Sequence, residues 1–265
     1  MHRLLGWAGR LPRKPKLQFA ALAVVVLTLL SFFVWGDNRG PFHTIDSTVA
    51  GETLLGADDR TITLTADWGP CNYRPDLVAR ESADHVALLL RQKDFSGPGV
   101  GCDGDGGTAR ISTKLDTALG DRPIVDAVTG KSVQIFPAQN LAEPDYLPSR
   151  YQEDTKPNRY MYGLVKAQDA SPQYTRAFRN GSNGGPAPLL ITQTIGSGGA
   201  TAGTDQIDVH GHPASFSNSQ SGSANTVRTL SWFDGKYQYS VSTTSPNQLS
   251  DQELSRIANG LVAPG

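Results

Sequence analysis

The residues of this chain best suited to chemistry are an acid and two histidines in one short segment. Asp208, His210 and His212 stand two apart in a stretch that reads like a β-strand. Alternate residues of a strand point to the same side, so the three side chains can converge on Zn²⁺, which accepts imidazole and carboxylate ligands. Gly211 and Pro213 indicate instead that the strand ends here, which favours two solvated histidines at a turn. We therefore predict no metal site and keep Asp208, His210 and His212 as the candidates to test.

Glycine-rich residues 99–107 contain two patterns that are typical of binding loops. Residues 99–104 match G-x-G-x-x-G, but a dinucleotide site needs a strand before this loop and a helix after it, and neither is indicated here. Asp103 and Asp105 could begin a calcium loop, yet Lys114 occupies the position where a bidentate Glu is needed. We predict a hairpin turn and no bound cofactor.

The sequence does not indicate a catalytic arrangement. It has no G-x-S-x-G elbow, and Ser197 lies in a glycine-rich loop without a positioned base. The adjacent carboxylates Asp58-Asp59 and Glu153-Asp154 are typical of solvated turns. Spacing alone leaves a Ser-His-Asp site open, but no feature favours it. We predict that the chain is not an enzyme.

Charge is distributed unevenly along the chain, although the formal net charge is only −1 at pH 7. Five of the 24 basic residues precede Leu17, and no acidic residue appears before Asp37. The rest of the chain therefore holds 19 basic residues against 25 acidic ones. An acidic body is a poor partner for phosphate backbones, so we predict no nucleic-acid binding.

An apolar run of nineteen residues, Leu17–Trp35, predicts a transmembrane helix. The run carries no charge, and at about 1.5 Å of rise per residue it spans roughly 28 Å, close to the thickness of the hydrocarbon core of a bilayer. A cleavable signal peptide needs small residues just after the run, but Thr48–Ala50, the nearest such pattern, lies about a dozen residues too far along. We expect the helix to remain and to hold the chain in the lipid bilayer. The basic flank predicts that residues 1–16 stay in the cytoplasm and that the chain from Gly36 onward is extracytoplasmic.

The first part of the exported chain alternates with a period of two. Residues 36–51 read as a stalk, and residues 52–136 as a folded unit. Val133 and Ile135 close the unit. Apolar and polar residues alternate along its three candidate strands, which are Arg60–Ala66, Asp84–Gln92 and Ala109–Leu115. This alternation, interrupted by Gly and Pro, predicts a small antiparallel β-sandwich.

A second unit follows a proline-rich boundary. Residues 137–149 hold three prolines and are the predicted linker, and residues 150–265 form the predicted second domain. Its candidate strands are residues 160–165, 189–195, 206–209, 227–233 and 236–241. We expect an α+β domain in which a C-terminal helix packs on an antiparallel sheet. The predicted fold is therefore mainly β, with an N-terminal transmembrane helix ahead of both units.

The strongest local signals of the second unit lie near its end. Asp234-Gly235 separates its last two candidate strands, and both residues tolerate the positive φ of a tight hairpin turn. Tyr237, Tyr239 and Val241 then share one face. Ser250 with Glu253 three residues later predicts the start of a helix. The helix has one apolar stripe, formed by Leu254, Ile257, Ala258 and Leu261.

Both cysteines of the chain, Cys71 and Cys102, fall in the first unit. A single pair in an exported domain predicts a disulfide. On the chain-entropy argument, closing a loop of this length adds roughly 3–4 kcal/mol of stability. The alternative, a redox or metal site made by two free thiols, lacks both a C-x-x-C spacing and a nearby histidine cluster.

Two stretches of the sequence resemble known families. Residues 71–128, with ESADHVALLL, the second cysteine and LGDRPIVDAVTG, resemble a domain of membrane-anchored actinobacterial proteins of unassigned function. The segments IDVHGHPASF, TLSWFDGKYQYSV and LSDQELSRIANGL resemble the hairpin-plus-helix end of extracytoplasmic sigma-factor regulatory domains of the RseB/MucB kind. The matching positions make the fold: Gly211, Trp232, Gly235, Tyr239, Leu254 and Ile257. The resemblance implies a regulator that acts through an exported partner, because sixteen cytoplasmic residues are too few to fold and bind a sigma factor.

The function predicted from the sequence is a non-catalytic binding or sensing module in the bacterial cell envelope. It is tethered by residues 17–35 and binds a ligand or another envelope protein. The first alternative is an accessory regulator of an envelope-stress or sigma-factor pathway. The second is an enzyme that acts on envelope polymers, which a deep polar cleft with perturbed carboxylates would favour.

Overall fold

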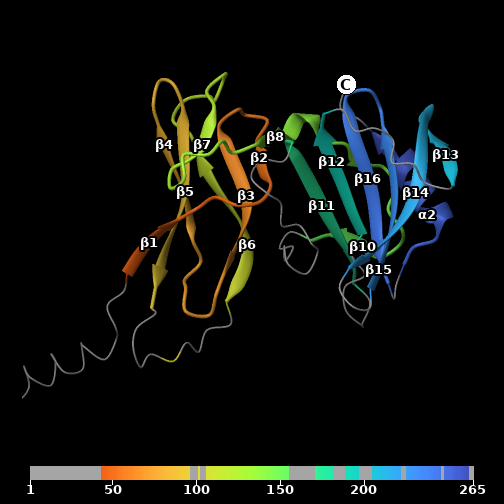
Figure 1. The fold of residues 1–265 in the computed structure, drawn as a ribbon, viewed down its shortest axis with the longest axis horizontal. Helices are drawn as coiled ribbons and strands as arrows, with labels where there is room; N and C mark the ends of the chain where they lie inside the picture. The colour runs from red at the N-terminus through yellow and green to blue at the C-terminus, as the bar shows by residue number, and fades with distance from the viewer. Residues whose placement is uncertain are drawn as a thin grey trace, which may run out of the picture. The chain divides into compact units, whose positions relative to one another are not determined.

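A computed structural model describes residues 43–95, 101, 106–154, 171–181, 189–196, 205–221, 225–245 and 248–262 of the chain. These residues form mainly antiparallel β-sheets, and one α-helix is present among them (Figure 1). No helix within these ranges is long and apolar enough to cross a membrane. The helix predicted at residues 17–35 lies outside the described residues, as does the predicted tail at residues 1–16.

Two small sheets make up the first part of the described chain. The strands of the first sheet are β1 (His43–Ser47), β4 (Asp76–Glu81), β5 (Val86–Asp94) and β7 (Ile124–Asp126). Those of the second are β2 (Thr53–Leu55), β3 (Thr61–Trp68), β6 (Gly107–Lys114) and β8 (Ile135–Pro137). Leu88 of β5, Leu64 of β3 and Ile111 of β6 are buried in one shared cluster, the first core. The period-two alternation predicted for β3 is confirmed, because Ile62, Leu64 and Ala66 are buried and the threonines between them are not.

This part differs from the prediction in two respects. Residues 43–51 do not form a free stalk, because β1 pairs with β5 and the buried Val49 donates its backbone N–H to Asp126 Oδ2 at 2.5 Å. Strand pairing is also not antiparallel throughout: β5 pairs with β7, and β2 with β8, in parallel. Three-residue strands alternate in the same way whichever direction they run, so the sequence does not indicate their direction.

The second part of the chain forms one antiparallel sheet, the large sheet, in the strand order β10-β11-β12-β16-β15-β14-β13. Its strands are β10 (Tyr151–Glu153), β11 (Gln173–Asn180), β12 (Leu189–Ile195), β13 (Gln206–Val209), β14 (His212–Ser221), β15 (Asn225–Phe233) and β16 (Tyr237–Thr244). Four of the predicted strands are present here, and residues 160–165, the fifth, lie outside the described residues. The prediction missed β10, β11 and β14. β14 is rich in Ser, Asn and Gln after Phe216, so it has neither the apolar alternation nor the residue types that favour strands.

Two tight hairpin turns shape one end of the large sheet. Val209 pairs with His212, and the two residues between them, His210 and Gly211, have φ values of 53° and 82°. This is the positive-φ pair that a two-residue hairpin requires. The predicted hairpin between β15 and β16 is present, but its central residues are Gly235 and Lys236, one residue later than predicted. The backbone N–H of Asp234 donates to the carbonyl of Tyr237, which closes the turn.

The helix α2 (Asp251–Asn259) packs against β13, β15 and β16. Its predicted start is confirmed, because Ser250 Oγ accepts a hydrogen bond from the backbone N–H of Glu253 at 3.2 Å. Leu254, Ile257 and Ala258 are buried against the large sheet. Together with buried residues of its strands, such as Leu189 and Leu230, they form a second hydrophobic cluster, the second core. Three residues of the predicted apolar stripe therefore form the face by which the helix attaches, but the fourth, Leu261, lies beyond the end of the helix in β17 (Leu261–Val262).

Residues 137–149, the predicted linker, lie against the second core. They contain the 3-10 turn η1 (Ala138–Asn140) and β9 (Glu143–Pro144), which pairs with β17 (Leu261–Val262) just after the helix. Ala142 is buried in the same core. The segment therefore helps to build the domain that it was predicted to precede.

Polar contacts link strand β11 of the large sheet to the residue before β2. The carboxylate of Glu52 accepts a hydrogen bond from Thr175 Oγ1 at 2.8 Å, and others from the backbone N–H of Thr175 and from Gln173 Nε2. Thr175 is only 4% exposed. Glu52 therefore supplies an acceptor for the backbone N–H of the buried Thr175 at this junction.

Candidate ligand-binding pocket

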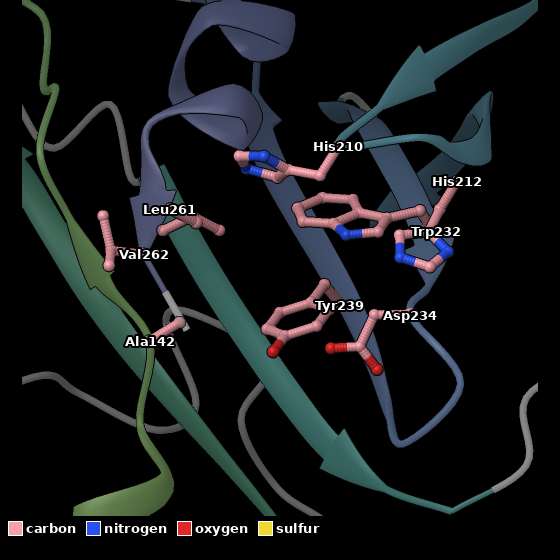
Figure 2. A pocket seen from close by; sticks show the side chains of 8 residues that line it. All are labelled: Ala142, His210, His212, Trp232, Asp234, Tyr239, Leu261 and Val262. Atoms are coloured by element: carbon pink, nitrogen blue, oxygen red, sulfur yellow. The ribbon is translucent and has the colours of Figure 1, made fainter. Parts of the chain in front are cut away.

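A pocket of about 330 Å³ opens at the end of the large sheet where the two hairpin turns lie (Figure 2). Strands β15 and β16, both turns, strand β17 and the segment before β9 all contribute to it. Its lining residues are Ala142, His210, His212, Trp232, Asp234, Tyr239, Leu261 and Val262. Most of this surface is aromatic or aliphatic, with a few polar groups, as is usual for small-molecule sites.

A pair of stacked aromatic rings forms the inner wall. Trp232 on β15 and Tyr239 on β16 are direct partners across the two strands. Their ring centroids are 5.0 Å apart and their planes differ by 12°. Both side chains are almost fully buried, at 2% and 3% exposed. This wall is therefore held by cross-strand packing and does not depend on a ligand for its position.

The hydroxyl of Tyr239 belongs to a polar network behind the wall. Gln193 Nε2 donates to Tyr239 Oη at 3.4 Å and to the carbonyl of Asn140 at 2.7 Å, while Gln193 Oε1 accepts from the backbone N–H of Ala142 at 2.9 Å. Burial raises the pKa of Tyr239 far above its ordinary value, and the nearby carboxylate of Asp234 raises it further. The phenol therefore remains protonated at physiological pH and keeps a proton to donate.

Asp234 supplies the carboxylate of the pocket. Its Oδ1 accepts hydrogen bonds from the backbone N–H groups of Lys236 at 2.8 Å and Tyr237 at 2.6 Å. These bonds fix the carboxylate beside the hairpin turn, and one of its oxygens points toward the Tyr239 hydroxyl (Figure 2). The described lining contains no Lys or Arg. The fixed charge of the pocket wall is therefore negative.

The residues considered for a metal site do not converge. Asp208 Oδ1 accepts the backbone N–H of Gly211 at 2.8 Å and so closes its own turn. His210 lies in that turn and His212 begins the next strand, and their rings lie on either side of the Trp232 indole (Figure 2). In the described part of the chain, no group of three or more His, Cys, Asp or Glu side chains could hold a metal ion. The spacing argument is wrong here because the turn breaks the strand periodicity at His210.

Two other predicted features can be placed in part. Cys71 forms a disulfide, but Cys102 lies outside the described residues, so the pairing of these two cysteines stays a prediction. Asp103, Asp105 and Ser197 also lie outside the described residues.

Glu153 is not the solvated turn residue that the sequence suggested. It lies on β10, and its carboxylate is paired with Arg110 at 3.1 Å and with Arg176 at 2.8 Å. Burial opposes ionisation, but the guanidinium groups of Arg176 and Arg110 outweigh it and lower the pKa of Glu153. Its neighbour Asp154 is buried. Neither carboxylate is therefore the solvated turn group that the sequence suggested: Glu153 is ion-paired and Asp154 is buried.

Sequence reasoning missed the pocket as a site. It identified Trp232, Asp234 and Tyr239 only as parts of a hairpin, and gave no role to Ala142 or Val262. The predicted hairpin was only part of the signal, because a turn at Asp234-Gly235 pairs Trp232 with Tyr237, whereas the turn one residue later in the structure pairs it with Tyr239. The aliphatic side could not be read locally, because it forms when β17 pairs with β9 far away in the sequence.

No family model matches the chain, and neither a curated protein nor a solved structure shows significant similarity to it. The two resemblances noted in the sequence therefore stay predictions. The geometry of the pocket is the basis on which a function can be inferred.

Proposed function

We propose that the chain is a non-catalytic binding protein of the cell envelope that takes a small ligand into the pocket at the end of the large sheet. The observation that carries this proposal is the combination of a preformed aromatic wall, an aliphatic side and a few polar groups in one concavity. Concave, mostly apolar sites with a few fixed polar groups are typical of ligand binding.

The polar groups of the pocket support binding better than catalysis. Its described lining offers no Ser, Thr, Cys or Lys as a nucleophile. Asp234 is the one carboxylate of the described lining, whereas glycoside hydrolysis ordinarily uses a pair flanking the scissile bond. An enzyme acting on envelope polymers therefore has less support at this site.

The setting of the pocket is part of the same proposal. Residues 17–35 anchor the chain in the bilayer as a single helix, with residues 1–16 in the cytoplasm and the pocket outside. The β-sandwich predicted at residues 52–136 also includes β1, and the α+β domain predicted at residues 150–265 also includes the segment 137–149. Ligand binding in the second domain is compatible with the alternative role as an accessory regulator, which crosslinking of the exported part to a membrane partner in living cells would test.

Occupancy of the pocket is tested with a variant that closes its mouth. Val262 lines the pocket and is 50% exposed, so Val262→Trp places a large side chain at the rim without cutting into the core. Val128 is also 50% exposed but is not part of the described pocket lining, so Val128→Trp is the matched control. Full-length protein in phospholipid nanodiscs is incubated with a small-molecule extract of the source organism's cell envelopes and studied by native mass spectrometry.

We expect the same small adduct on the unmodified protein and on Val128→Trp, and none on Val262→Trp. Absence of any adduct, or an adduct that persists in Val262→Trp, would refute binding in this pocket. Equal melting temperatures of the two variants establish that the difference comes from the closed mouth.

A further inference from the structure

The indole N–H of Trp232 is a donor for which the described part of the chain provides no acceptor. Trp232 is 2% exposed, yet within the described residues its Nε1–H has no hydrogen-bond acceptor. Nε1 itself is not completely buried, so a ligand atom can reach it from the pocket. In the view of Figure 2 it lies on the side of the indole nearer to Asp234, while the face of the ring stacks on Tyr239. Buried indole N–H groups usually have an acceptor, so this one indicates a place for a ligand atom.

The same space holds an acceptor with a negative charge. Asp234 is fixed by two backbone N–H groups on Oδ1, and its carboxylate lies next to the protonated hydroxyl of Tyr239. A ligand in the pocket thus meets an indole donor and a carboxylate acceptor on the same side. It must offer an acceptor to the first and a donor to the second.

Charge decides between the ligand classes that could meet these demands. A phosphate or carboxylate would accept from Trp232 but would face the Asp234 carboxylate with no Lys or Arg in the described lining to offset it. An ammonium group would suit Asp234 and leave the Trp232 N–H without an acceptor. A hydroxyl both donates and accepts, so neighbouring hydroxyls on one neutral ring satisfy both groups.

The remaining lining fits the rest of such a ring. The rings of His210 and His212 stand on either side of the indole, and their nitrogens can form hydrogen bonds with further hydroxyls. Leu261, Val262 and Ala142 supply an apolar side for the C–H faces of the ring. A volume of about 330 Å³ is at the lower end of the range for ligand pockets, which restricts the ligand to a small molecule or a terminal residue of a larger one.

We propose that the pocket recognises a neutral sugar, free or as the end residue of a glycan, through hydroxyls bound to Trp232 Nε1–H and the Asp234 carboxylate. This proposal rests on the proposed binding function and specifies the ligand class of that site. Because the ligand is uncharged, its affinity is insensitive to salt.

The test uses full-length protein in phospholipid nanodiscs, which avoids sugar-based detergents. The probes are glucose, galactose, N-acetylglucosamine and inositol, and the comparisons that carry ionised groups are cationic ethanolamine, anionic acetate and zwitterionic alanine. Binding is followed through the ¹⁵N-indole NMR signal of Trp232, identified by its loss in Trp232→Phe, and by calorimetry. We expect at least one sugar to shift this signal saturably, with an affinity that is unchanged between low and high salt.

Two variants separate the roles of the polar groups. Trp232→Phe keeps an aromatic ring and removes the N–H, which should weaken sugar binding roughly tenfold, while Trp68→Phe on β3 should leave it unchanged. Asp234→Asn keeps an oxygen for the two turn N–H groups, so the hairpin is preserved. It should weaken a sugar by roughly tenfold, because a hydroxyl can accept from the amide, but should abolish binding of an ammonium ligand.

The outcomes distinguish this inference from the proposal on which it rests. If the envelope extract gives an adduct that Val262→Trp removes, but only a charged probe shifts the Trp232 signal, the sugar assignment is wrong and the binding function stands. If neither the extract nor any probe occupies the pocket, both fail. If Trp232→Phe melts far below the unmodified protein, the test rests on Asp234→Asn. Sugar binding weakened roughly tenfold then supports the sugar assignment, and unchanged sugar binding contradicts it.

Discussion

Trp232 on β15 and Tyr239 on β16 are cross-strand partners whose rings stack with centroids 5.0 Å apart. The contact contributes to the second core and also forms the inner wall of the pocket. Fold and site therefore share the same side chains. The pocket is rigid on this side, so a ligand binds without ordering the wall, which lowers the entropic cost of binding.

Truncating the two rings should have unequal effects on stability. Trp232→Ala removes a buried indole from the second core and should lower the free energy of unfolding by about 3–5 kcal/mol. Tyr239→Phe keeps the ring and removes only the hydroxyl that accepts from Gln193, so it should cost about 0.5–1.5 kcal/mol. Chemical unfolding of both variants measures the difference. Similar losses would contradict the stacked ring as the main contribution.

The junction at Glu52 gives a second prediction about stability. Glu52→Ala removes the acceptor of the Thr175 backbone N–H and hydroxyl, and should destabilise the protein by about 1–3 kcal/mol because these groups are buried. Glu143→Ala is the matched control. Its carboxylate also pairs with a residue of β11, Arg176, but is 69% exposed, so its loss should cost no more than about 1 kcal/mol. Equal melting temperatures for the two variants would show that the junction contributes little.

Local signals explain what the sequence could predict. The hairpin between β15 and β16 and the helix start at Ser250 depend on residues within a few positions of each other, and both are present in the structure, the hairpin with its turn one residue later than predicted. β14 was not predicted because most of its residues are polar and do not alternate with apolar ones. The pocket was not predicted because Ala142 and Val262 line the same cavity as Trp232 only when β9 pairs with β17. No local pattern encodes that contact.

Asp58 should make the first core sensitive to acid. The backbone N–H of Thr61, then its hydroxyl and the backbone N–H of Arg60, lower the pKa of Asp58 from 3.8 to about 2. A carboxyl whose pKa is lower in the folded state stabilises the protein above pH 3.8, and this contribution is lost as the pH falls toward 2. Asp58→Asn should therefore lower the melting temperature at pH 5 to 7 and have a diminishing effect between pH 4 and 2. A difference that stays constant over this range would contradict the assignment.

The predicted disulfide between Cys71 and Cys102 can be tested without knowledge of any ligand. Because the link closes a loop, Cys71→Ser should lower the free energy of unfolding by roughly 3–4 kcal/mol, and the melting temperature by several degrees. Mass measurement under non-reducing conditions should show no free thiol. If the two cysteines are paired, Cys71→Ser/Cys102→Ser should be as stable as the single variant, because both lack the same bond. Stoichiometric labelling of both thiols in the native, unreduced protein would contradict the pairing.

The predicted membrane topology rests on the basic residues before Leu17 and on the uncharged run at residues 17–35. Positive residues resist translocation, so the chain after the run should be exported. An enzyme reporter that is active only outside the cytoplasm should be active when fused after Gly265. The protein should also migrate at full length in the membrane fraction. As a control, Val25→Arg/Val26→Arg places two charges in the centre of the run, at a cost of several kcal/mol, and should abolish membrane retention. A mature chain in the medium that begins near Gly36 would show that the segment is cleaved and that the protein acts as a soluble exported factor.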